Sequence, residues 1–286
     1  MIGGNTMWDI LIIGGGPAGL SAAVNCIARG KTCAVLTNDF RNNPLYKTEL
    51  VENYAGMRGY SGKDMLQQMT KEAEEAGAAF MSGRVTSILP MEDSFLVALG
   101  DEMLEGKRII LCTGIMTGAE LPGEKQLVGR GVSYCATCDG MLYRGKHAVV
   151  TGNAPDLVEE AKFLQQIGVQ VTLITKAPVN PSLHIPQMKA RKLSISGSEK
   201  VEAVVADGQT IPCDVVFVLR DTLSASVLIP GLKMTGQFIR VNRSMETNIP
   251  GVFAAGDCTG KPLQIAKAVG EGLIAAQNAA KSIKMK

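Results

Sequence analysis

The sequence predicts an α/β protein that contains two nucleotide-binding folds of the Rossmann type. Three observations lead to this prediction. Near the start of the chain, a buried strand pattern runs directly into a glycine-rich turn and an apolar helix. A second strand–turn–helix pattern begins near residue 147, and a last strand ends in Gly256-Asp257 before a long alanine-rich helix. A chain of 286 residues also has the length of about two domains.

The first βαβ unit is predicted from an apolar run, its turn and the helix that follows. Trp8–Ile13 is the buried strand, and the glycine-rich turn 14–19 comes directly after it. Leu20–Arg29 is the helix, Gly30 ends it, and Thr32–Leu36 is the next strand. The unit spans about 30 residues, which is the length that such a unit needs.

Further elements follow from helical and strand periodicity along the chain. In the first part these are a helix and then strands, at Asp64–Ala76, Val85–Leu89, Phe95–Leu99, Met103–Leu104 and Arg108–Leu111. The second βαβ unit is His147–Thr151, Asp156–Ile167 and Val169–Thr175. The remaining strands are Val201–Ala206, Val215–Leu219 and Gly251–Gly256, with a hairpin turn at Asp207-Gly208. The last helix, Pro262–Ser282, is apolar on one face, so we expect it to pack on the first domain.

The overall charge and composition exclude several classes of partner. The formal net charge is +2, and 46% of the residues are hydrophobic, so bulk charge indicates neither a nucleic-acid nor a membrane partner. Met1–Met7 lacks the basic region and cleavage site of a secretory signal. Ile10–Leu20 is too short and too rich in glycine to span a bilayer. We therefore expect a cytoplasmic protein.

The cysteine count argues against a structural disulfide framework, because the 7 cysteines are odd in number and scattered along the chain. Four of them lie in or beside apolar helix and strand patterns, and we expect these to be small buried residues: Cys26, Cys33, Cys112 and Cys213. No zinc-type spacing is present, and the 2 histidines, His147 and His184, are expected to be structural. We therefore expect no metal site.

The first turn has the pattern of a dinucleotide-binding site. Gly14 permits the tight turn, Gly16 lets the backbone approach a pyrophosphate, and Gly19 lets helix and strand pack closely. The start of the helix then presents free N–H groups to the phosphates. The acidic residue usual at the end of the next strand is absent, so we expect ribose contacts from Thr37, Asn38 or Asp39.

The stretch Cys135-Ala136-Thr137-Cys138-Asp139 predicts redox chemistry. Two cysteines that are two residues apart can cycle between dithiol and disulfide. The carboxylate of Asp139 follows directly and can move the protons that this cycling requires. We therefore predict Cys135, Cys138 and Asp139 as the catalytic residues.

With these motifs in place, the chain resembles the low-molecular-weight thioredoxin reductases over nearly its full length. Four motifs carry the resemblance: Gly14–Leu20, Val51-Glu52-Asn53, Cys135–Gly140 and Phe253–Asp257. The resemblance implies a homodimeric flavoenzyme that reduces thioredoxin. It also implies an FAD-binding domain built from residues 1–115 and 242–286, with a redox-disulfide domain, 116–241, inserted in it.

The resemblance also assigns roles to single residues. It places Cys138 against the flavin. The implied FAD contacts are Gly14, Gly16, Pro17, Ala18, Gly19, Thr37, Asn38, Thr48, Asn53, Val85, Thr113, Gly114, Gly256, Asp257, Gln264, Ile265 and Ala266. Cys258 follows Asp257 directly, and we expect a packing role for it rather than a third redox sulfur.

The chain departs from the NADPH-using members of this family in its second turn. That turn reads Thr151-Gly152-Asn153-Ala154-Pro155-Asp156, so only the first glycine of the pattern is present. Ala154 puts a methyl group where the backbone should approach a pyrophosphate. The segment after the next strand, Thr175–Pro181, contains a single lysine and no arginine for a 2′-phosphate. This pattern resembles the ferredoxin-dependent flavin thioredoxin reductases of anaerobic bacteria.

A ferredoxin donor is energetically reasonable. Plant-type ferredoxins lie at about −400 mV and a thioredoxin dithiol lies at about −270 mV. The difference is worth about 6 kcal/mol for two electrons. FAD can accept electrons singly and release them in pairs, which this pairing requires. An acidic ferredoxin favours a basic docking surface, and the candidate is Lys189, Arg191 and Lys192, although a solvated surface face is the simpler interpretation.

Three alternatives to this interpretation stay open. The chain could be an NADPH-dependent thioredoxin reductase with an unusual nucleotide site. It could be a non-catalytic sensor that keeps FAD and the disulfide, although the presence of Asp139 argues against a sensor. The substrate could also be another protein with the thioredoxin fold.

Overall fold

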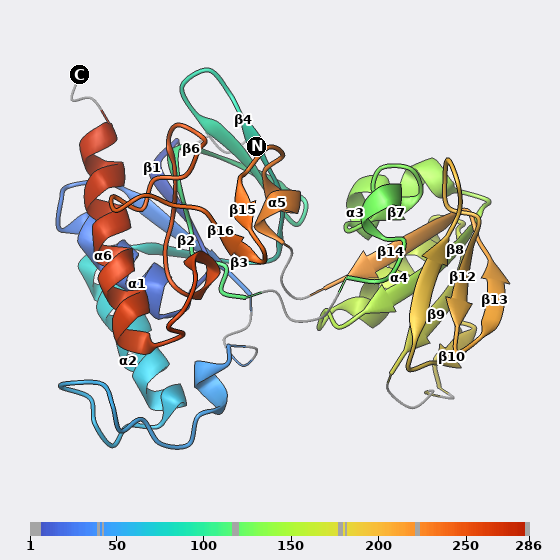
Figure 1. The fold of residues 1–286 in the computed structure, drawn as a ribbon, viewed down its shortest axis with the longest axis horizontal. Coiled ribbons are helices and arrows are strands. Elements are labelled where there is room, and N and C mark those ends of the chain that lie inside the picture. Colours follow the sequence, from blue (N-terminus) through green and yellow to red (C-terminus); the bar gives the residue numbers. More distant parts are fainter. Residues whose placement is uncertain are drawn as a thin grey trace. The chain divides into compact units, whose positions relative to one another are not determined.

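The computed structural model describes residues 7–38, 41, 43–115, 120–176, 180, 182–220 and 224–283. The chain forms two compact units, each of them an α/β fold around a parallel sheet (Figure 1). The first unit consists of residues 1–116 and 223–286, and the second, 117–222, is inserted in it. The predicted fold class is therefore confirmed.

The chain returns to the first unit earlier than the sequence suggested. The predicted boundary is at residue 242, whereas the second unit ends at Thr222. Helix α5 (Ala225–Leu228) contacts strand β4 (Val85–Pro90), and β16 (Phe238–Ile239) contacts the short helix η5 (Asp257–Thr259). Residues 224–241 therefore pack within the first unit, and the inserted unit, 117–222, is shorter than predicted.

Five parallel strands of the first unit end at the same edge of its sheet. They are β3 (Ala79–Ser82), β2 (Cys33–Thr37), β1 (Trp8–Ile13), β6 (Glu102–Leu111) and β17 (Val252–Ala254), in that order across the sheet. The register pairs Ile13 with both Leu36 and Leu111. The segments that follow these strands therefore meet, and this edge is where the predicted cofactor residues gather.

An antiparallel pair extends the same sheet beside the first half of β6. β4 pairs with β5 (Phe95–Leu99), and β5 pairs with β6. The sequence predicts two separate strands, Met103–Leu104 and Arg108–Leu111, but the structure has one continuous strand through Gly106. A Cβ atom at Gly106 would lie 2.7 Å from the Leu11 side chain, so this glycine is a packing requirement and not a strand break.

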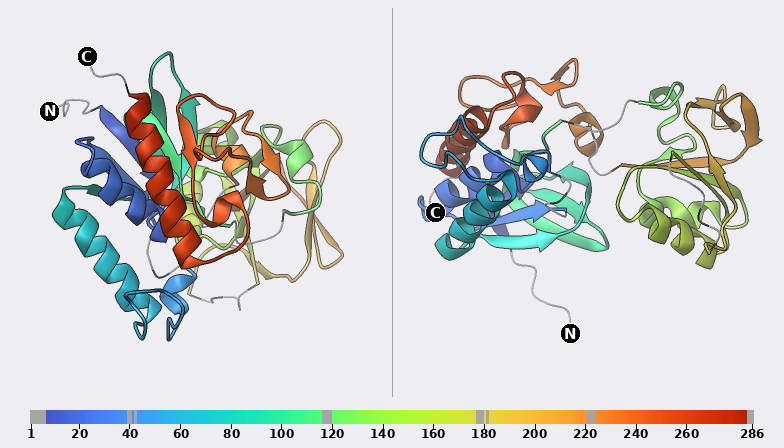
Figure 2. Two further views of the ribbon diagram at one scale, coloured as in Figure 1. Left: turned by 60° about the vertical axis from the view of Figure 1, so that its left-hand side comes forward. Right: turned by 90° about the horizontal axis from the view of Figure 1, so that it is seen from below.

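Helices α1 (Pro17–Ile27), α2 (Gly62–Ala76) and α6 (Ile265–Ser282) cover the first sheet. α6 lies alongside α1 (Figures 1 and 2), which confirms that the last helix packs on the first domain. The two helices pack so closely that a Cβ atom at Gly272 would lie 2.2 Å from the carbonyl oxygen of Ala18. The alanines between the two helices are fully buried, at Ala22, Ala23, Ala275, Ala276 and Ala279.

The second unit has its own parallel sheet. Its strand order is β10 (Gln187–Lys189), β9 (Gln170–Thr175), β8 (His147–Gly152), β14 (Val215–Leu219) and β7 (Val132–Ser133). Helix α4 (Leu157–Gln166) packs its buried Ala161 and Leu164 in the same core as Val150 and Phe217. The short helix α3 (Ala136–Asp139) contacts α4 and carries the cysteine motif.

A smaller antiparallel sheet completes the second unit. It contains β11 (Leu193–Ser196), β12 (Ala203–Ala206) and β13 (Gln209–Pro212). The turn between β12 and β13 is the predicted Asp207-Gly208 hairpin, and both residues have positive φ angles of 47° and 90°. Other short elements are β15 (Met234–Thr235), η2 (Leu45–Lys47), η3 (Lys125–Leu127) and η4 (Gly140–Tyr143). In the part of the chain that the structure describes, no helix is long and apolar enough to cross a membrane.

A buried ion pair holds the two ends of the second unit together. Arg220, near its exit, donates two hydrogen bonds of 2.6 Å to the carboxylate of Glu124, near its entry. Both side chains are almost fully buried. Burial alone would raise the pKa of Glu124, but the hydrogen bonds from Arg220, Leu121 and Tyr134 and the Arg220 charge together outweigh it and hold that pKa below its usual range. Tyr134, next to Cys135, donates to the same carboxylate.

Removal of the Arg220 charge should destabilise the second unit strongly. Arg220→Met leaves the buried Glu124 carboxylate without its counter-charge, which costs about 3–5 kcal/mol. The free energy of unfolding in urea measures this loss. The matched control is Lys71→Met, because Lys71 and Glu75 form an exposed pair that is worth at most about 1 kcal/mol. An equal effect of both variants would contradict a stabilising role for the buried pair.

Candidate functional site

The glycine-rich turn between β1 and α1 requires glycine for steric reasons. Gly14 has φ +114°, and a Cβ atom there would lie 2.3 Å from the carbonyl oxygen of Cys112. A Cβ atom at Gly19 would lie 1.9 Å from the carbonyl oxygen of Gly14. Gly16 is the N-cap of α1, and the first turn of this helix carries no acidic residue. The turn therefore offers an uncrowded helix N-terminus to an anionic group such as a phosphate.

The ends of β2 and β3 lie beside this turn. The hydroxyl of Thr37 accepts a hydrogen bond of 3.2 Å from the backbone N–H of Gly15. The N–H of Gly83 donates to the carbonyl oxygen of Thr37, so the chain leading to Val85 starts from the same edge. Asn38 follows Thr37, whereas Asp39 lies outside the described residues. Thr37 is thus part of the turn, while a ribose contact from Thr37 or Asn38 stays a prediction.

The ends of β6 and β17 complete the edge. Thr113 and Gly114 follow β6, and Gly256 and Asp257 follow β17. A Cβ atom at Gly256 would lie 2.8 Å from the Cβ of Ala18, so the last strand touches the start of α1. Burial raises the pKa of Asp257, and Lys267 partly offsets this effect.

A lysine–glutamate pair that the sequence prediction missed organises the Gly256–Gly260 turn. The Lys267 ammonium donates to the carbonyl oxygens of Gly256 and Gly260, both at 2.7 Å. The Glu271 carboxylate accepts from the N–H of Gly256 at 2.9 Å and lies 3.1 Å from Lys267. Their spacing of four residues along α6 is the available sequence signal, but it does not show which turn the pair holds.

Cys258 is a buried neutral thiol. Its single S–H proton is shared between the carbonyl oxygens of Leu111 and Ala255, at 3.4 and 3.2 Å. Burial raises the pKa of this thiol to about 11. A neutral, hydrogen-bonded thiol suits the packing role proposed for it. The other unpaired cysteines of the described chain, Cys26, Cys33, Cys112 and Cys213, are buried as predicted.

The loop after η2 is tied to the start of α6. The side-chain amide of Asn53 donates to the side-chain oxygen of Gln264 at 2.9 Å. Thr48 accepts a backbone hydrogen bond from Gly62, which anchors the other end of this loop. Ile265 and Ala266 begin α6 directly after Gln264. The structure therefore links predicted cofactor residues that are about 200 positions apart.

The residues of this edge fit a dinucleotide such as FAD. A close-approach glycine turn and a helix N-terminus free of acidic residues suit the pyrophosphate. The carboxylate of Asp257 suits the hydroxyl groups of a ribityl chain. Both features come from one sheet edge of the first unit.

The structure contains the predicted Cys135–Cys138 disulfide, with the two Cα atoms 5.3 Å apart. The pair follows β7 at the carboxyl edge of the second sheet, and Cys135 is the N-cap of α3. The sulfur of Cys135 accepts a hydrogen bond of 3.1 Å from the N–H of Cys138. Cys135 is buried, whereas Cys138 is exposed, so the two sulfurs differ in access.

Asp139 is held beside the disulfide by Ser133, which the sequence prediction missed. The hydroxyl of Ser133 donates to the Asp139 carboxylate at 2.7 Å and accepts from the N–H of Cys135 at 3.2 Å. A small polar residue at the end of β7, two positions before the first cysteine, is the available signal. Burial and the nearby Asp139 charge together raise the pKa of Tyr143.

The second glycine turn keeps its shape but has lost its free N–H groups. A Cβ atom at Gly152 would lie 1.7 Å from the carbonyl oxygen of Leu219, so β8 and β14 are in close contact. That same carbonyl accepts from the N–H groups of Asn153 and Ala154, at 2.9 and 3.1 Å. The donors that a pyrophosphate would need are therefore bound to the chain itself.

The start of α4 is also acidic, in contrast to that of α1. Asp156 is the N-cap residue, and Glu159 and Glu160 lie in the first turn. Carboxylates at this position repel a phosphate that approaches the helix N-terminus. Lys176, the one lysine after β9, is exposed, while Ala177, Pro178, Val179 and Pro181 lie outside the described residues.

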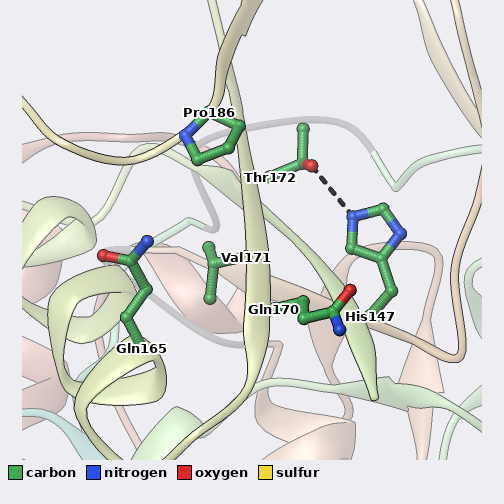
Figure 3. Close-up of a pocket in the computed structure, with 6 residues that line it drawn as sticks. All are labelled: His147, Gln165, Gln170, Val171, Thr172 and Pro186. Carbon is green, nitrogen blue, oxygen red and sulfur yellow. Dashed lines mark hydrogen bonds between the residues drawn. The ribbon is translucent and has the colours of Figure 1, made fainter. Parts of the chain in front are cut away.

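A shallow hollow of about 270 Å³ lies elsewhere on the second unit (Figure 3). The ring of His147 lies at its edge, with Nδ1 2.6 Å from the carbonyl oxygen of Pro212 and Nε2 2.9 Å from the Thr172 hydroxyl. A carbonyl only accepts, so Nδ1 carries the proton and Nε2 accepts from Thr172. Both ring nitrogens of His147 are thus used structurally.

The described residues contain no group of three or more His, Cys, Asp or Glu side chains arranged to hold a metal ion.

The predicted basic cluster is exposed but shares its charge with an acid. Lys189, Arg191 and Lys192 are all exposed on the second unit. The carboxylate of Asp207 accepts from the backbone N–H groups of Arg191 and Lys192, at 2.9 and 2.8 Å. These hydrogen bonds lower the pKa of Asp207, so it stays charged and offsets part of the cluster.

The chain is similar to known oxidoreductases over most of its length. The family model of the pyridine nucleotide-disulphide oxidoreductases matches residues 8–180 and 185–272. Thioredoxin reductase of Bacillus subtilis is 30% identical over 295 residues, which cover 95% of this chain and 93% of that protein.

Two solved structures share the fold over nearly their full length. A ferredoxin-flavin thioredoxin reductase from Clostridium acetobutylicum is 36% identical with a TM-score of 0.86, and 97% of each chain is covered. A thioredoxin reductase from Gloeobacter violaceus is 32% identical with a TM-score of 0.78, covering 96% of this chain and 93% of that one. Together with the disulfide and the glycine turn, these matches show that the chain belongs to the thioredoxin reductases, within the pyridine nucleotide-disulphide oxidoreductase family.

Proposed function

We propose that this protein passes electrons from reduced ferredoxin, through FAD, to the Cys135–Cys138 disulfide and from there to thioredoxin. The observation that carries the proposal is the hydrogen bonding of the Leu219 carbonyl, which occupies the N–H groups of Asn153 and Ala154. In the NADPH-using members of the family, the corresponding turn binds the pyrophosphate of NADPH, and here its N–H groups are already bonded to Leu219. The solved relative described as a ferredoxin-flavin enzyme supports this choice of donor.

Binding of NADPH at the second unit would be opposed twice. The pyrophosphate would have to compete with the Leu219 carbonyl for its donors, and a buried carbonyl that loses its partners costs about 1–3 kcal/mol. It would also approach the carboxylates of Asp156 and Glu159 at the start of α4. Both obstacles are weaker at α1, because its first turn carries no acidic residue and the N–H of Gly15 is bonded to the Thr37 hydroxyl rather than to a strand carbonyl.

FAD is proposed at the carboxyl edge of the first unit. The turn 14–19 would hold its pyrophosphate, and Asp257 would hold its ribityl hydroxyls. Asn53 and Gln264, which are hydrogen-bonded to each other, would lie near the ring system. When bound, FAD supplies the conversion of single electrons into the pair that a disulfide needs.

The chain itself carries out the thiol–disulfide exchange. Cys138 is proposed as the sulfur on the flavin side, and its exposure suits that role. Once the pair is reduced, one cysteine thiolate attacks a partner disulfide, a mixed disulfide forms, and the partner's leaving sulfur takes a proton from Asp139. The second cysteine then gives its proton to Asp139 and attacks the mixed disulfide. The partner's second sulfur leaves and takes that proton, and the Cys135–Cys138 disulfide is restored. Two electrons and two protons reach the partner.

An exposed apolar pair beside the disulfide supports a protein substrate. Met141 and Leu142 follow the motif and are 59% and 71% exposed. Gly140 fits η4 tightly against α4, since a Cβ atom there would lie 2.8 Å from the Leu164 side chain. Exposed apolar groups beside a reactive bond favour coverage by a partner, and thioredoxin is the partner that the family implies.

Three further properties are proposed. Five of the described cysteines are unpaired, which suits a reducing compartment such as the cytoplasm. A homodimer is proposed from the family resemblance. The cluster Lys189, Arg191 and Lys192 is a candidate docking surface for ferredoxin, although Asp207 reduces its net charge.

The electron donor can be tested directly. In anaerobic assays with the FAD-loaded protein and thioredoxin, reduced ferredoxin should support turnover, while NADPH and NADH should not bleach the flavin absorbance. The physical reason is that the N–H groups of Asn153 and Ala154 are already occupied. Prompt bleaching by NADPH would instead establish the NADPH-dependent alternative, and bleaching without any thioredoxin reduction would favour a sensor.

Both cysteines should be essential to the exchange. Cys135→Ser and Cys138→Ser should each abolish thioredoxin reduction, because a single thiol cannot form the intramolecular disulfide that releases the mixed intermediate. Cys213→Ser, which removes an unpaired buried cysteine of the same unit, is the matched control and should retain turnover. Thioredoxin reduction that survives either of the first two changes would refute this mechanism.

The apolar pair should matter for substrate binding and not for chemistry. Replacement of Met141 and Leu142 together by alanine should raise the KM for thioredoxin by about tenfold, since about 1–2 kcal/mol of apolar burial is lost. The kcat should stay within about twofold. Val128→Ala removes another exposed apolar residue of this unit, 41% exposed, and should leave KM unchanged. A fall in kcat with constant KM would argue against docking at this pair.

A further inference from the structure

We propose that Ser133 is a positioning residue that holds the Asp139 carboxylate in place for proton transfer to and from the thiol pair. This inference rests on the proposed exchange chemistry at Cys135 and Cys138. It does not depend on the identity of the electron donor or of the protein substrate.

The position of Ser133 is fixed by the sheet. It is the last residue of β7, and its Cα pairs with that of Phe217 in the neighbouring β14. Phe217 is fully buried, and Ser133 itself is only 5% exposed. The serine is therefore part of the rigid carboxyl edge of the sheet, whereas α3 with Asp139 is a single short turn.

One hydroxyl group connects both ends of the redox motif. Ser133 Oγ lies 2.7 Å from the Asp139 carboxylate and 3.2 Å from the carbonyl oxygen of Cys135. The single hydroxyl proton goes to the carboxylate, because that acceptor is charged and the distance is shorter. The lone pairs of the hydroxyl then accept the N–H of Cys135 at 3.2 Å. The two hydrogen bonds therefore run in one direction, from the Cys135 N–H through the Ser133 hydroxyl to the Asp139 carboxylate, and each strengthens the other.

This arrangement restricts a side chain that otherwise has freedom to rotate. Asp139 is half-buried, and its backbone N–H reaches the carbonyl oxygen of Cys135 at 3.3 Å. The bond from Ser133 engages one carboxylate oxygen, Oδ2. The other oxygen, Oδ1, is then the one that exchanges the proton with a cysteine sulfur or with the leaving sulfur of a partner.

The inference can be tested on the exchange half-reaction alone. The cysteine pair of the full-length flavoprotein is reduced with dithiothreitol, which is then removed anaerobically, and hydroxyethyl disulfide is added. Acid quenching, alkylation and mass spectrometry follow the loss of the two thiols. Ser133→Ala should slow this single turnover by about tenfold, because a hydrogen bond to a charged group is lost.

A double-mutant cycle separates positioning from general structural damage. In an Asp139→Asn background, Ser133→Ala should cause no further slowing, because the carboxylate that it positions is gone. Ser133→Thr keeps the hydroxyl and should restore most of the rate. Ser94→Ala is the matched control, since Ser94 is also buried and donates to a carboxylate, that of Glu105, at 2.6 Å. It should leave the rate unchanged.

The outcomes are distinct from those of the proposed function. Equal slowing by Ser133→Ala in the presence and absence of the Asp139 carboxylate would overturn the inference, as would no slowing at all. A wild-type protein that exchanges with hydroxyethyl disulfide but never reduces thioredoxin would refute the proposed substrate and leave the role of Ser133 intact.

Discussion

The structure depends on one constraint, which is that parallel strands bring their carboxyl ends to a single edge of a sheet. In the first unit this edge collects segments from residue 14 to residue 257, and in the second it collects the disulfide and the second turn. At such an edge some backbone N–H groups after the strands bond to a neighbouring strand, as that of Gly14 does to Leu36, while a helix start can offer its N–H groups to a ligand. Function is decided by what then binds them.

The two glycine turns show how the same topology reaches opposite results. Around Gly14 the strand ends pack closely, yet the first turn of α1 carries no acidic residue. Around Gly152 the strands pack just as closely, but the Leu219 carbonyl takes the two N–H groups of the turn. The first turn is therefore suited to an anion, whereas the second serves the internal stability of its unit.

The redox motif combines an exposed sulfur with a support of buried polar residues. Cys138 is accessible, while Cys135, Ser133 and the Glu124–Arg220 ion pair are buried. Tyr134 connects the ion pair to the segment that carries the disulfide. This buried support holds the segment of the disulfide, while Cys138 stays exposed to a partner.

The sequence by itself determined the fold class, both βαβ units, the cysteine pair and the packing of the last helix, because strand and helix periodicity and glycine spacing are local properties. The two strands predicted on either side of Gly106 are one strand. In the sequence, a glycine that makes room for the Leu11 side chain cannot be distinguished from a glycine that ends a strand. Only the tertiary structure decided the return of the chain at residue 223 and the partners of Glu124, Ser133 and Lys267. The closure of the second turn by Leu219 was also invisible in the sequence, because it joins atoms more than 60 residues apart through the pairing of β8 and β14.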